Sequence, residues 1–577
     1  MKLTDFLHFL ADLLCILTDF FRFLTHIRST RLLLVTRMSH LILTNPLEMK
    51  KIILSCLLLL GSVSVVAQEY YDITQMRKLQ TVQLAIANLY VDSVDFKKLT
   101  EDAIVGMLEK LDPHSQYSNP EETKKLNEPL EGNFEGIGVQ FRMLEDTLIV
   151  SRPTPKGPSE KVGVMAGDRI VGVNGEVIAG VKMPQDSIMK KLRGPKGTVA
   201  RLKIVRTGLA DTLYFDVTRD KIPLHTVDAA YMIAPGVGYI LLERFGATSG
   251  KEVEDKIAEL QAQGMKSLIF DLKLNGGGYL GAAAEVASQF LPQGSLVVYT
   301  DGRNMPSQKL NAQGGGLFKE GRVVVLVDEY SASAAEIVSG ALQDYDRAVL
   351  VGRRTFGKGL VQRPIELEDG SMIRLTVSHY YTPSGRCIQK PYEKGKKEEY
   401  RDDLDHRYEH GELTCLDSIR LDSTKVYKTF YKKRTVYGGG GIMPDVFVPL
   451  DTLEFTDTYR KISRANLIVN ESLRYFNDNR KALEKKYPTF EAFNADYVVP
   501  EKLINTILKK AAEKDIKPKD DNEKVQTIDQ LSYMLKALVA YDIWERNEYL
   551  RIINERDDIV QRALQIITSE DYDTYLQ

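Results

Sequence analysis

The sequence predicts a multidomain α/β protein, and three observations lead to that fold class. The chain has 577 residues, too many for one hydrophobic core, so several domains are expected. A buried strand, a turn and a helix follow one another twice, over 266–290 and over 323–342, as in a sheet covered by helices. Between 132 and 220 the pattern changes to short alternating strands separated by glycine turns, which predicts a separate β-rich domain.

The composition is that of an ordinary soluble globular protein. Hydrophobic residues make up 43% and charged residues 27% of the chain. The net charge of −2 indicates no basic surface, so we expect no nucleic-acid partner. The four cysteines include no CxxC pair, which excludes a zinc ribbon.

The N-terminal stretch carries the pattern of an export signal that begins at an internal methionine. Met49-Lys50-Lys51 is followed by an apolar run and by a small-residue exit at Ala67. We therefore expect residues 1–48 to be upstream translation from a wrongly assigned start, and residues 49–67 to be a signal peptide. The expected location is outside the cytoplasm, first the periplasm, with membrane association or secretion as alternatives.

Two other interpretations of this stretch are less favoured. A membrane anchor over Phe6–Phe23 would bury Asp12 and Asp19. Inserting an aspartate at the centre of a membrane helix costs a free energy of about 2.5–3.5 kcal/mol. Lipoprotein processing at Cys56 would leave an apolar run between the lysines and the cysteine that is too short for the hydrophobic part of a signal peptide. In an exported chain Cys387 and Cys415 would remain, either as a disulfide or as two free thiols.

A serine and a lysine stand out in the second half of the chain. Ser333 lies in a sharp turn between the buried strand 323–327 and a helix that begins with small residues. Such a turn exposes a hydroxyl and places backbone N–H groups beside it. Lys358 is flanked by glycines, and a desolvated lysine can be neutral near pH 7 and take a proton from serine. Gln362, four residues on, could orient the amine.

A glycine run follows the first buried strand of the core. Asn275-Gly276-Gly277-Gly278 lies between that strand and a helix, so its N–H groups can converge on an anion. A phosphate loop is one interpretation, but no Gly-Lys-Ser/Thr follows the run.

These segments resemble the signature of the C-terminal processing (tail-specific) peptidases, a Ser–Lys family. SASAAE, QDYDRA and TFGKGLVQ carry the resemblance, together with DLKLNGGG and the closing phrase GGIMPDVFVPLD. It implies a crotonase-like α/β-spiral protease core and a serine endopeptidase that needs no metal or cofactor. It implies the following roles: nucleophile Ser333, general base Lys358, its partner Gln362, oxyanion donors Gly278 or Gly277 with Ala334, and the site-supporting Asp344.

The β-rich region resembles a PDZ domain. The loop Gly136-Ile137-Gly138-Val139 leads into a strand, and GPSEKVGVMAGDRIVGVNG and LRGPKGT follow in the PDZ order. The resemblance implies that this loop binds the C-terminal tail of a polypeptide substrate through main-chain hydrogen bonds. Ile137 and Val139 would then line the pocket that gives selectivity.

The remaining regions complete the predicted organisation. An apolar stripe in the last part of the chain, which includes Leu531 and Leu535, is either core packing or a surface for homo-oligomers. The expected divisions are 68–130 helical, 131–220 PDZ domain, 221–451 protease core with a charged exposed insert at 391–436, and 452–577 helical.

Three alternative functions remain for testing. His406-Arg407-Tyr408-Glu409-His410 fits a zinc-peptidase pattern, but its neighbours are all polar, unlike the dry pocket of a catalytic zinc. His379 could pair with Ser333 instead of Lys358. The third alternative is a non-catalytic scaffold that binds tails through the PDZ domain.

Overall fold

The structure is a computed structural model that describes residues 73–577. The chain divides into two compact units, and the division falls at Leu99. The first unit contains helix α4 (Ile73–Leu89), which has no buried residue, and α5 (Phe96–Leu108) spans the division. No helix among the described residues is long and apolar enough to cross a membrane.

The expectations for the N-terminus concern residues that lie outside this range. The upstream translation expected for 1–48 and the signal peptide expected for 49–67 both fall before Ile73. They therefore stay predictions from the sequence.

A six-stranded sheet forms the centre of the second unit. Every neighbouring pair of its strands is parallel except β10–β11. The strands at its centre are buried on both faces, which explains why they are continuous apolar runs rather than alternating ones. The order is β10 (Val227–Ala234), β11 (Val237–Leu242), β12 (Ser267–Asp271), β15 (Arg322–Val327), β16 (Val349–Gly352) and β21 (Val446–Phe447).

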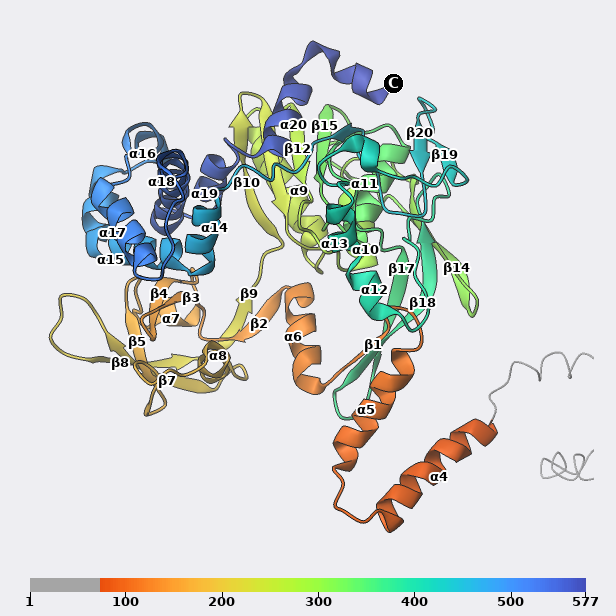
Figure 1. Ribbon diagram of the computed structural model, residues 1–577, viewed down its shortest axis with the longest axis horizontal. Helices are drawn as coiled ribbons and strands as arrows, with labels where there is room; N and C mark the ends of the chain where they lie inside the picture. Colours follow the sequence, from red (N-terminus) through yellow and green to blue (C-terminus); the bar gives the residue numbers. More distant parts are fainter. Residues whose placement is uncertain (1–72) are drawn as a thin grey trace, which may run out of the picture. The chain divides into compact units, whose positions relative to one another are not determined.

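Helices from distant parts of the sequence cover the two faces of this sheet (Figure 1). One face packs against α9 (Ser249–Ala262), α10 (Leu280–Ala287) and α11 (Ala334–Asp344). The other face packs against α19 (Arg546–Ile553) and α20 (Asp558–Thr568), and η2 (Glu570–Leu576) follows α20. The last helices of the chain thus belong to the protease core as well as to the helical region predicted over 452–577.

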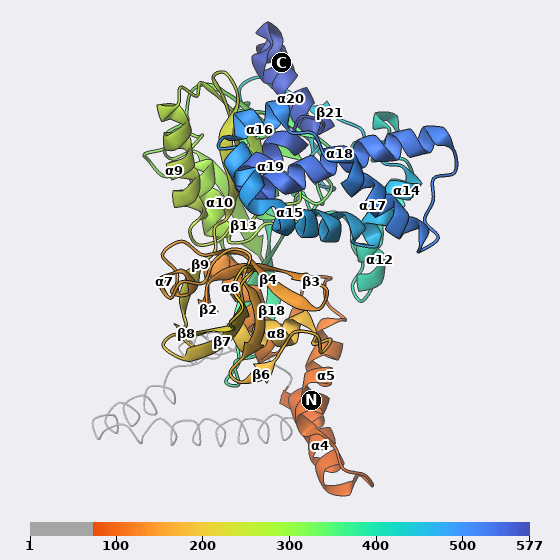
Figure 2. The same cartoon turned by 90° about the vertical axis from the view of Figure 1, so that its left-hand side faces the viewer.

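The rest of that helical region is a bundle with its own hydrophobic core. Leu531 and Leu535 are buried inside the bundle, so core packing is the correct interpretation of their apolar stripe. The bundle lies to the left of the core in Figure 1 and in front of it in Figure 2. Its helices are α14 (Asp457–Arg464), α15 (Leu467–Lys486), α16 (Phe490–Asp496), α17 (Glu501–Ala512) and α18 (Asp521–Ile543).

The predicted PDZ domain is a compact β structure with short helices. Strands β2 (Asn133–Gly136) and β9 (Asp220–Pro223) pair with each other where the chain enters and leaves it. Its sheet has the order β3 (Val139–Leu144), β4 (Thr147–Pro153), β5 (Arg169–Val173), β7 (Val199–Val205), β8 (Leu213–Thr218), with β6 (Glu176–Val177) beside β5 and helices α7 (Pro158–Lys161) and α8 (Gln185–Leu192).

A second sheet and the charged insert complete the core. In the sheet β18 (Met372–Tyr381) lies between β1 (Gln116–Ser118) and β13 (Leu296–Gly302), while β17 (Leu360–Glu366) also pairs with β18 and β14 (Met305–Asn311) with β13. The helix α6 (Pro120–Glu131) follows β1. The insert forms α12 (Lys397–Arg401), α13 (Asp403–Glu409), η1 (Leu416–Ser418), β19 (Val426–Lys428) and β20 (Thr435–Tyr437).

Most of the insert is exposed, as its charge suggested, but a few of its side chains are buried. Tyr400, Arg407 and Val436 are buried. Arg407 donates to Glu412 at 2.7 Å and to the backbone oxygens of Thr355 and Arg354 at 3.1 and 2.7 Å. The charge of Arg407 is therefore paired inside the protein, and part of the insert lies beside the candidate site.

The helical bundle contacts strand β3 of the predicted PDZ domain through a buried carboxyl. Asp542 accepts from Arg142 at 3.0 Å, and the Arg142 guanidinium lies 4.9 Å from the centre of the Tyr541 ring. Burial raises the pKa of Asp542 to about 6, although the charges of Arg142 and its neighbours lower it. Leu144 and Leu473 pack together in the same interface.

This carboxyl predicts a pH-dependent contribution to stability. Because the pKa of Asp542 is higher in the folded protein than in the unfolded chain, the folded protein binds a proton at this carboxyl more tightly than the unfolded chain does. The contribution of this protonation to the free energy of unfolding is full below about pH 4 and is lost as the pH rises through about 6. We expect the unfolding temperature of Asp542→Asn, relative to wild type, to increase from pH 4 to pH 7. Glu145→Gln, in the exposed pair with Arg474, is the control and should show no such trend.

Candidate active site

The turn that carries Ser333 is held by hydrogen bonds to the glycine run. Ser333 precedes α11 with φ +58° and ψ −114°, a backbone conformation that costs about 1–3 kcal/mol outside glycine. Ser331 Oγ donates to the Leu272 oxygen at 2.8 Å, and the Ala332 N–H donates to the Asn275 oxygen at 2.9 Å. The predicted strand–turn–helix is thus present, and it presents Ser333 at its apex.

A buried carboxyl joins the serine turn to the lysine loop. Glu336 Oε2 accepts from the N–H groups of Ser333 at 2.8 Å and Lys358 at 2.9 Å. Its Oε1 accepts from the Gly357 N–H at 2.7 Å and from Thr355 Oγ1 at 2.5 Å. Burial raises the pKa of Glu336, against the effect of these hydrogen bonds. Glu336 was not among the predicted site residues, although Ser333-x-x-Glu336 has the sequence of a capping box.

The glycine run packs directly against the serine turn. A Cβ on Gly277 would lie 2.7 Å from Ser333 Cβ and 3.0 Å from the Ala334 nitrogen. The Gly277 N–H already donates to Asn275 Oδ1 at 2.8 Å, so it is not free to bind an oxyanion. Within residues 73–577 the N–H groups of Gly278 and Ala334 donate to no other group. Of the two predicted glycine donors, Gly278 is the one with a free N–H.

Lys358 and Gln362 line one cavity of about 330 Å³. Burial, and after it the charge of Arg374, lower the pKa of Lys358 to about 8. Ser333 does not line this cavity, and no hydrogen bond joins Ser333 Oγ to the lysine amine in the described part of the chain. The backbones of Ser333 and Lys358 are nevertheless held together by Glu336, which accepts from both N–H groups.

Gln362 is linked through Thr376 of β18 to Asp112, which lies in the turn that precedes β1. Its Nε2 donates to the Leu360 oxygen and to Thr376 Oγ1, both at 3.2 Å, and Thr376 Oγ1 donates to Asp112 Oδ1 at 2.7 Å. Burial alone would raise the pKa of Asp112, but hydrogen bonds from Ser115, Thr376 and the backbone hold it below its usual value. Asp112 and Thr376 are thus positioning residues that the sequence analysis missed.

The neighbouring histidine has a partner that the sequence did not reveal. The Nε2 atom of His114 lies 3.0 Å from Tyr400 Oη in the insert. Burial, and then the charge of Lys358, lower the pKa of His114 to about 3. His114 is therefore a neutral wall of the cavity that Lys358 lines.

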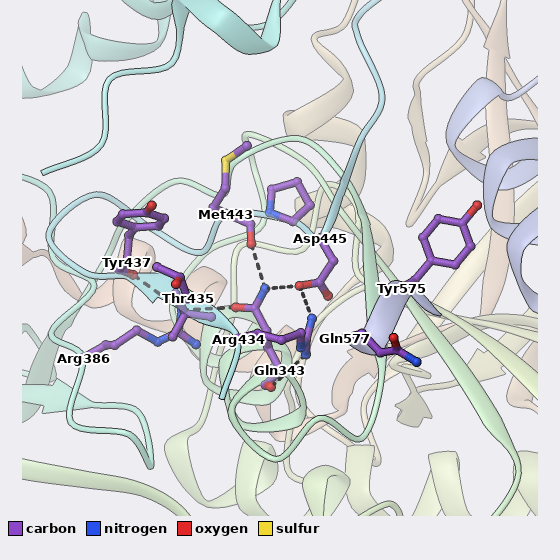
Figure 3. Close-up of a pocket in the computed structure, with 11 residues that line it drawn as sticks. Gln343, Arg386, Arg434, Thr435, Tyr437, Met443, Asp445, Tyr575 and Gln577 are labelled. Carbon is purple, nitrogen blue, oxygen red and sulfur yellow. Dashed lines mark hydrogen bonds and ion pairs between the residues drawn. The ribbon is translucent and has the colours of Figure 1, made fainter. Parts of the chain in front are cut away.

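Asp344 lies at the other end of α11, away from the reacting groups. It is fully buried and paired with the buried Arg386, and it accepts from the Ser384 N–H at 2.9 Å. Figure 3 shows Arg386 next to Gln343, which donates to the Met443 oxygen and to Asp445, each at 2.9 Å. This polar cluster fixes the end of α11, which agrees with a supporting role for Asp344.

The PDZ loop differs in one respect from its predicted role. Ile137 is buried in the hydrophobic core of the PDZ domain, so its side chain cannot line a selectivity pocket as predicted. The Ile137 oxygen accepts from Ser159 Oγ at 2.6 Å and the Gly138 oxygen accepts from the Thr154 N–H at 2.9 Å. The loop Gly136 to Val139 is therefore held by its carbonyl groups, and binding of a tail by its N–H groups stays a prediction.

The groups that supported the alternative functions lie apart from this site. Tyr380 Oη donates to the Ser333 oxygen at 3.1 Å, and because side chains alternate along β18, the exposed His379 points to the opposite face. His406 and His410 are exposed, and residues 73–577 contain no group of three or more potential metal ligands. The two remaining cysteines, Cys387 and Cys415, are free thiols.

Comparison with known proteins places these features in one family. The model of peptidase family S41 matches residues 236–396 and the model of the PDZ domain matches 136–219. The model of the N-terminal domain of the activating protease CtpB matches 61–123, and a family of unknown function matches 458–545.

Curated relatives and solved structures have related names. The carboxy-terminal-processing protease of Bartonella bacilliformis is 35% identical over 319 residues, which are 55% of this chain and 73% of that protein. The carboxy-terminal processing protease CtpB of Bacillus subtilis is 35% identical over 318 residues, which are 55% of this chain and 66% of that protein. The structure of the photosystem II D1 C-terminal processing protease is 29% identical, with a TM-score of 0.31, and the match covers 53% of this chain and 83% of that one. The chain thus belongs to the S41 peptidases, among the PDZ-containing carboxy-terminal processing proteases of the serine type.

Proposed function

We propose that the protein cleaves peptide bonds by Ser–Lys acyl transfer, on polypeptides whose C-terminal tails the PDZ domain binds. The observation that carries this proposal is the shared carboxylate of Glu336, which holds the backbones of Ser333 and Lys358 together. It is supported by the burial that lowers the pKa of Lys358 to about 8.

The reaction begins when the neutral Lys358 amine rotates to Ser333 and takes the hydroxyl proton. Ser333 Oγ then attacks the peptide carbonyl carbon, and the oxyanion accepts from the N–H groups of Gly278 and Ala334. As the intermediate collapses, the C–N bond breaks and the lysine ammonium gives its proton to the leaving amine. Lys358 next takes a proton from the water that attacks the ester carbonyl, and as the acyl C–O bond breaks the lysine ammonium returns a proton to Ser333 Oγ. Gln362, held by Thr376, limits the directions in which the lysine amine can point.

Protease assays on three variants test this mechanism. Ser333→Ala and Lys358→Ala should each lower kcat/KM by about 10³-fold or more, because each removes a reacting group. Lys394→Ala, which changes an exposed lysine of the insert, is the control and should retain full activity. Activity in wild type that survives a chelator would exclude the zinc-peptidase alternative. Equal activity in all variants would contradict the mechanism, and tail binding without any wild-type proteolysis would support the scaffold.

The pH dependence of the reaction follows from the same lysine. Only the neutral amine accepts a proton, so kcat/KM should rise about tenfold per pH unit below pH 8 and level off above it. Arg374→Gln removes a neighbouring positive charge, so the Lys358 pKa should rise and the curve should move to higher pH. Rates with a neutral substrate from pH 5 to pH 10 measure both curves. A curve that does not move in Arg374→Gln would contradict this account of the lysine.

The proposal also includes export of the protein, whereas a homo-oligomer stays a prediction that the apolar stripe, which is core packing, does not support. Export is supported by the signal pattern over 49–67, with the periplasm as the expected compartment. Mass spectrometry of the protein from the cell envelope should find an N-terminus near Gln68, and an intact Met1 would contradict it. Light scattering of residues 68–577 tests for a homo-oligomer.

A further inference from the structure

The cavity that Lys358 lines contains four cationic side chains from three parts of the fold. Lys358 comes from the loop before β17, Arg374 from β18, and Lys397 and Arg401 from α12. The other lining residues are neutral, and none is a carboxylate: Pro113, His114, Gln116, Phe356, Gln362 and Tyr400.

These four charges are not neutralised by the protein. Among residues 73–577 none of them forms an ion pair, although ion pairs are common on the surface nearby. Arg374 contacts Gln116, whose amide oxygen can accept from Arg374 Nε at 3.2 Å. Like charges that surround one cavity create a positive potential, which is costly without a ligand and attracts an anion.

The remaining titratable groups around Lys358 do not cancel this potential. His114, from the turn before β1, is neutral, and it contacts the buried Tyr400 of α12. Asp112 and Glu336 are the carboxyl groups whose charges raise the pKa of Lys358, so they offset part of the potential at the lysine, but neither lines the cavity or pairs with Arg374, Lys397 or Arg401. Lys390, which acts on His114, is paired with Asp403 at 2.7 Å.

We propose that this cavity is a subsite for a carboxylate of the peptide substrate, either an acidic side chain near the scissile bond or the terminal carboxylate. Arginine forks match carboxylate geometry and lysine supplies further donors. A volume of about 330 Å³ accommodates one such side chain. The proposal rests on the proposed function for the role of Lys358, and it adds a substrate class to it.

A bound carboxylate has a cost for catalysis that makes the proposal distinctive. A negative charge beside Lys358 stabilises its ammonium form, so the pKa of the lysine rises in the enzyme–substrate complex. The curve of kcat against pH for a Glu-containing substrate should therefore be shifted by about one pH unit to higher pH, relative to the curve for the same substrate with Gln. The kcat/KM profiles report the free enzyme, so their lower limbs should coincide.

Binding can be measured without catalysis in Ser333→Ala, because Ser333 does not line the cavity. Three peptides of one sequence serve as probes: one with Glu and an amidated end, one with Gln and an amidated end, and one with Gln and a free carboxylate. Amidation prevents recognition of the chain end by the PDZ domain. We expect the Glu peptide to bind about tenfold more tightly than the amidated Gln peptide.

Two cavity variants and one matched control locate the subsite. Lys397→Gln and Arg401→Gln, each in the Ser333→Ala background, should each weaken the Glu peptide about fivefold and leave the amidated Gln peptide unchanged. Lys394→Gln, an exposed lysine of the same insert that does not line the cavity, should change neither affinity. A similar loss for the free-carboxylate peptide would show that the subsite also takes the terminal carboxylate.

Two results would overturn the proposal. One is equal affinity for the amidated Glu and Gln peptides together with no loss for the free-carboxylate peptide in the cavity variants, and the other is an equal loss in Lys394→Gln and the cavity variants. The proposed function fails differently, by full proteolysis in Lys358→Ala, and that result would leave the binding measurements unaffected.

Discussion

Replacing Glu336 by alanine is expected to abolish proteolysis and to lower the free energy of unfolding by about 3–5 kcal/mol. Four buried donors would lose their acceptor: the N–H groups of Ser333, Gly357 and Lys358, and the Thr355 hydroxyl. Each unsatisfied donor costs about 1–3 kcal/mol, and the losses are not additive because the donors share one cavity. The free energy of unfolding from a denaturant titration measures the effect on the fold.

Glu336→Gln separates the effect on the site from the effect on the fold. The glutamine fills the same volume, but its NH₂ group must face at least one donor that the carboxylate accepted. We expect the variant to stay folded at wild-type unfolding temperature within a few degrees, with kcat lower by about 100-fold because the serine and lysine loops move apart.

A matched control is available in α6, which begins with an exposed capping box. Glu122 accepts from the Asn119 N–H at 3.0 Å, as Glu336 does from Ser333, but it contacts no part of the site. Glu122→Gln should therefore leave kcat unchanged. A Glu336→Gln enzyme with wild-type kcat would show that the shared carboxylate does not position the two reacting groups.

The elements of the core were predictable because their signals are local. The run Val323–Val327 is wholly buried, and a strand covered on both faces must be apolar throughout. The turn at Ser333 follows from the small residues and the helix that come next in the sequence. The insert at 391–436 is mostly exposed as predicted, but its few buried charges were not foreseen because their partners lie outside it, such as Arg354, which donates to Glu412 at 2.7 Å.

The residues that support the site were hidden for the same reason. Thr376 Oγ1 reaches Asp112 across 264 positions of sequence, and His114 reaches Tyr400 across 286. No periodicity or motif in one sequence encodes such pairs. The burial of Ile137 was also missed, because one residue's shift in a glycine loop decides whether a side chain faces the core or the solvent.

The second large effect is expected from Gly278→Ala. Gly278 has φ +149°, which L side chains rarely adopt, and an added Cβ would lie 2.1 Å from the Phe245 oxygen. Since Phe245 is fully buried, the glycine run must move instead, and this displaces the free N–H of Gly278. Loss of one oxyanion donor costs about 2.7–4 kcal/mol of transition-state stabilisation, so kcat should fall about 10²–10³-fold.

The neighbouring glycine provides the control for this substitution. A Cβ on Gly276 meets no atom within 4 Å, and its φ lies outside the range that favours glycine, so Gly276→Ala should fold and react normally. In Gly278→Ala the loss should fall on kcat, with KM changed little, because the donor binds the oxyanion more strongly than the ground-state carbonyl. A loss confined to KM would instead assign Gly278 to substrate binding, and the oxyanion would then need a donor other than this N–H.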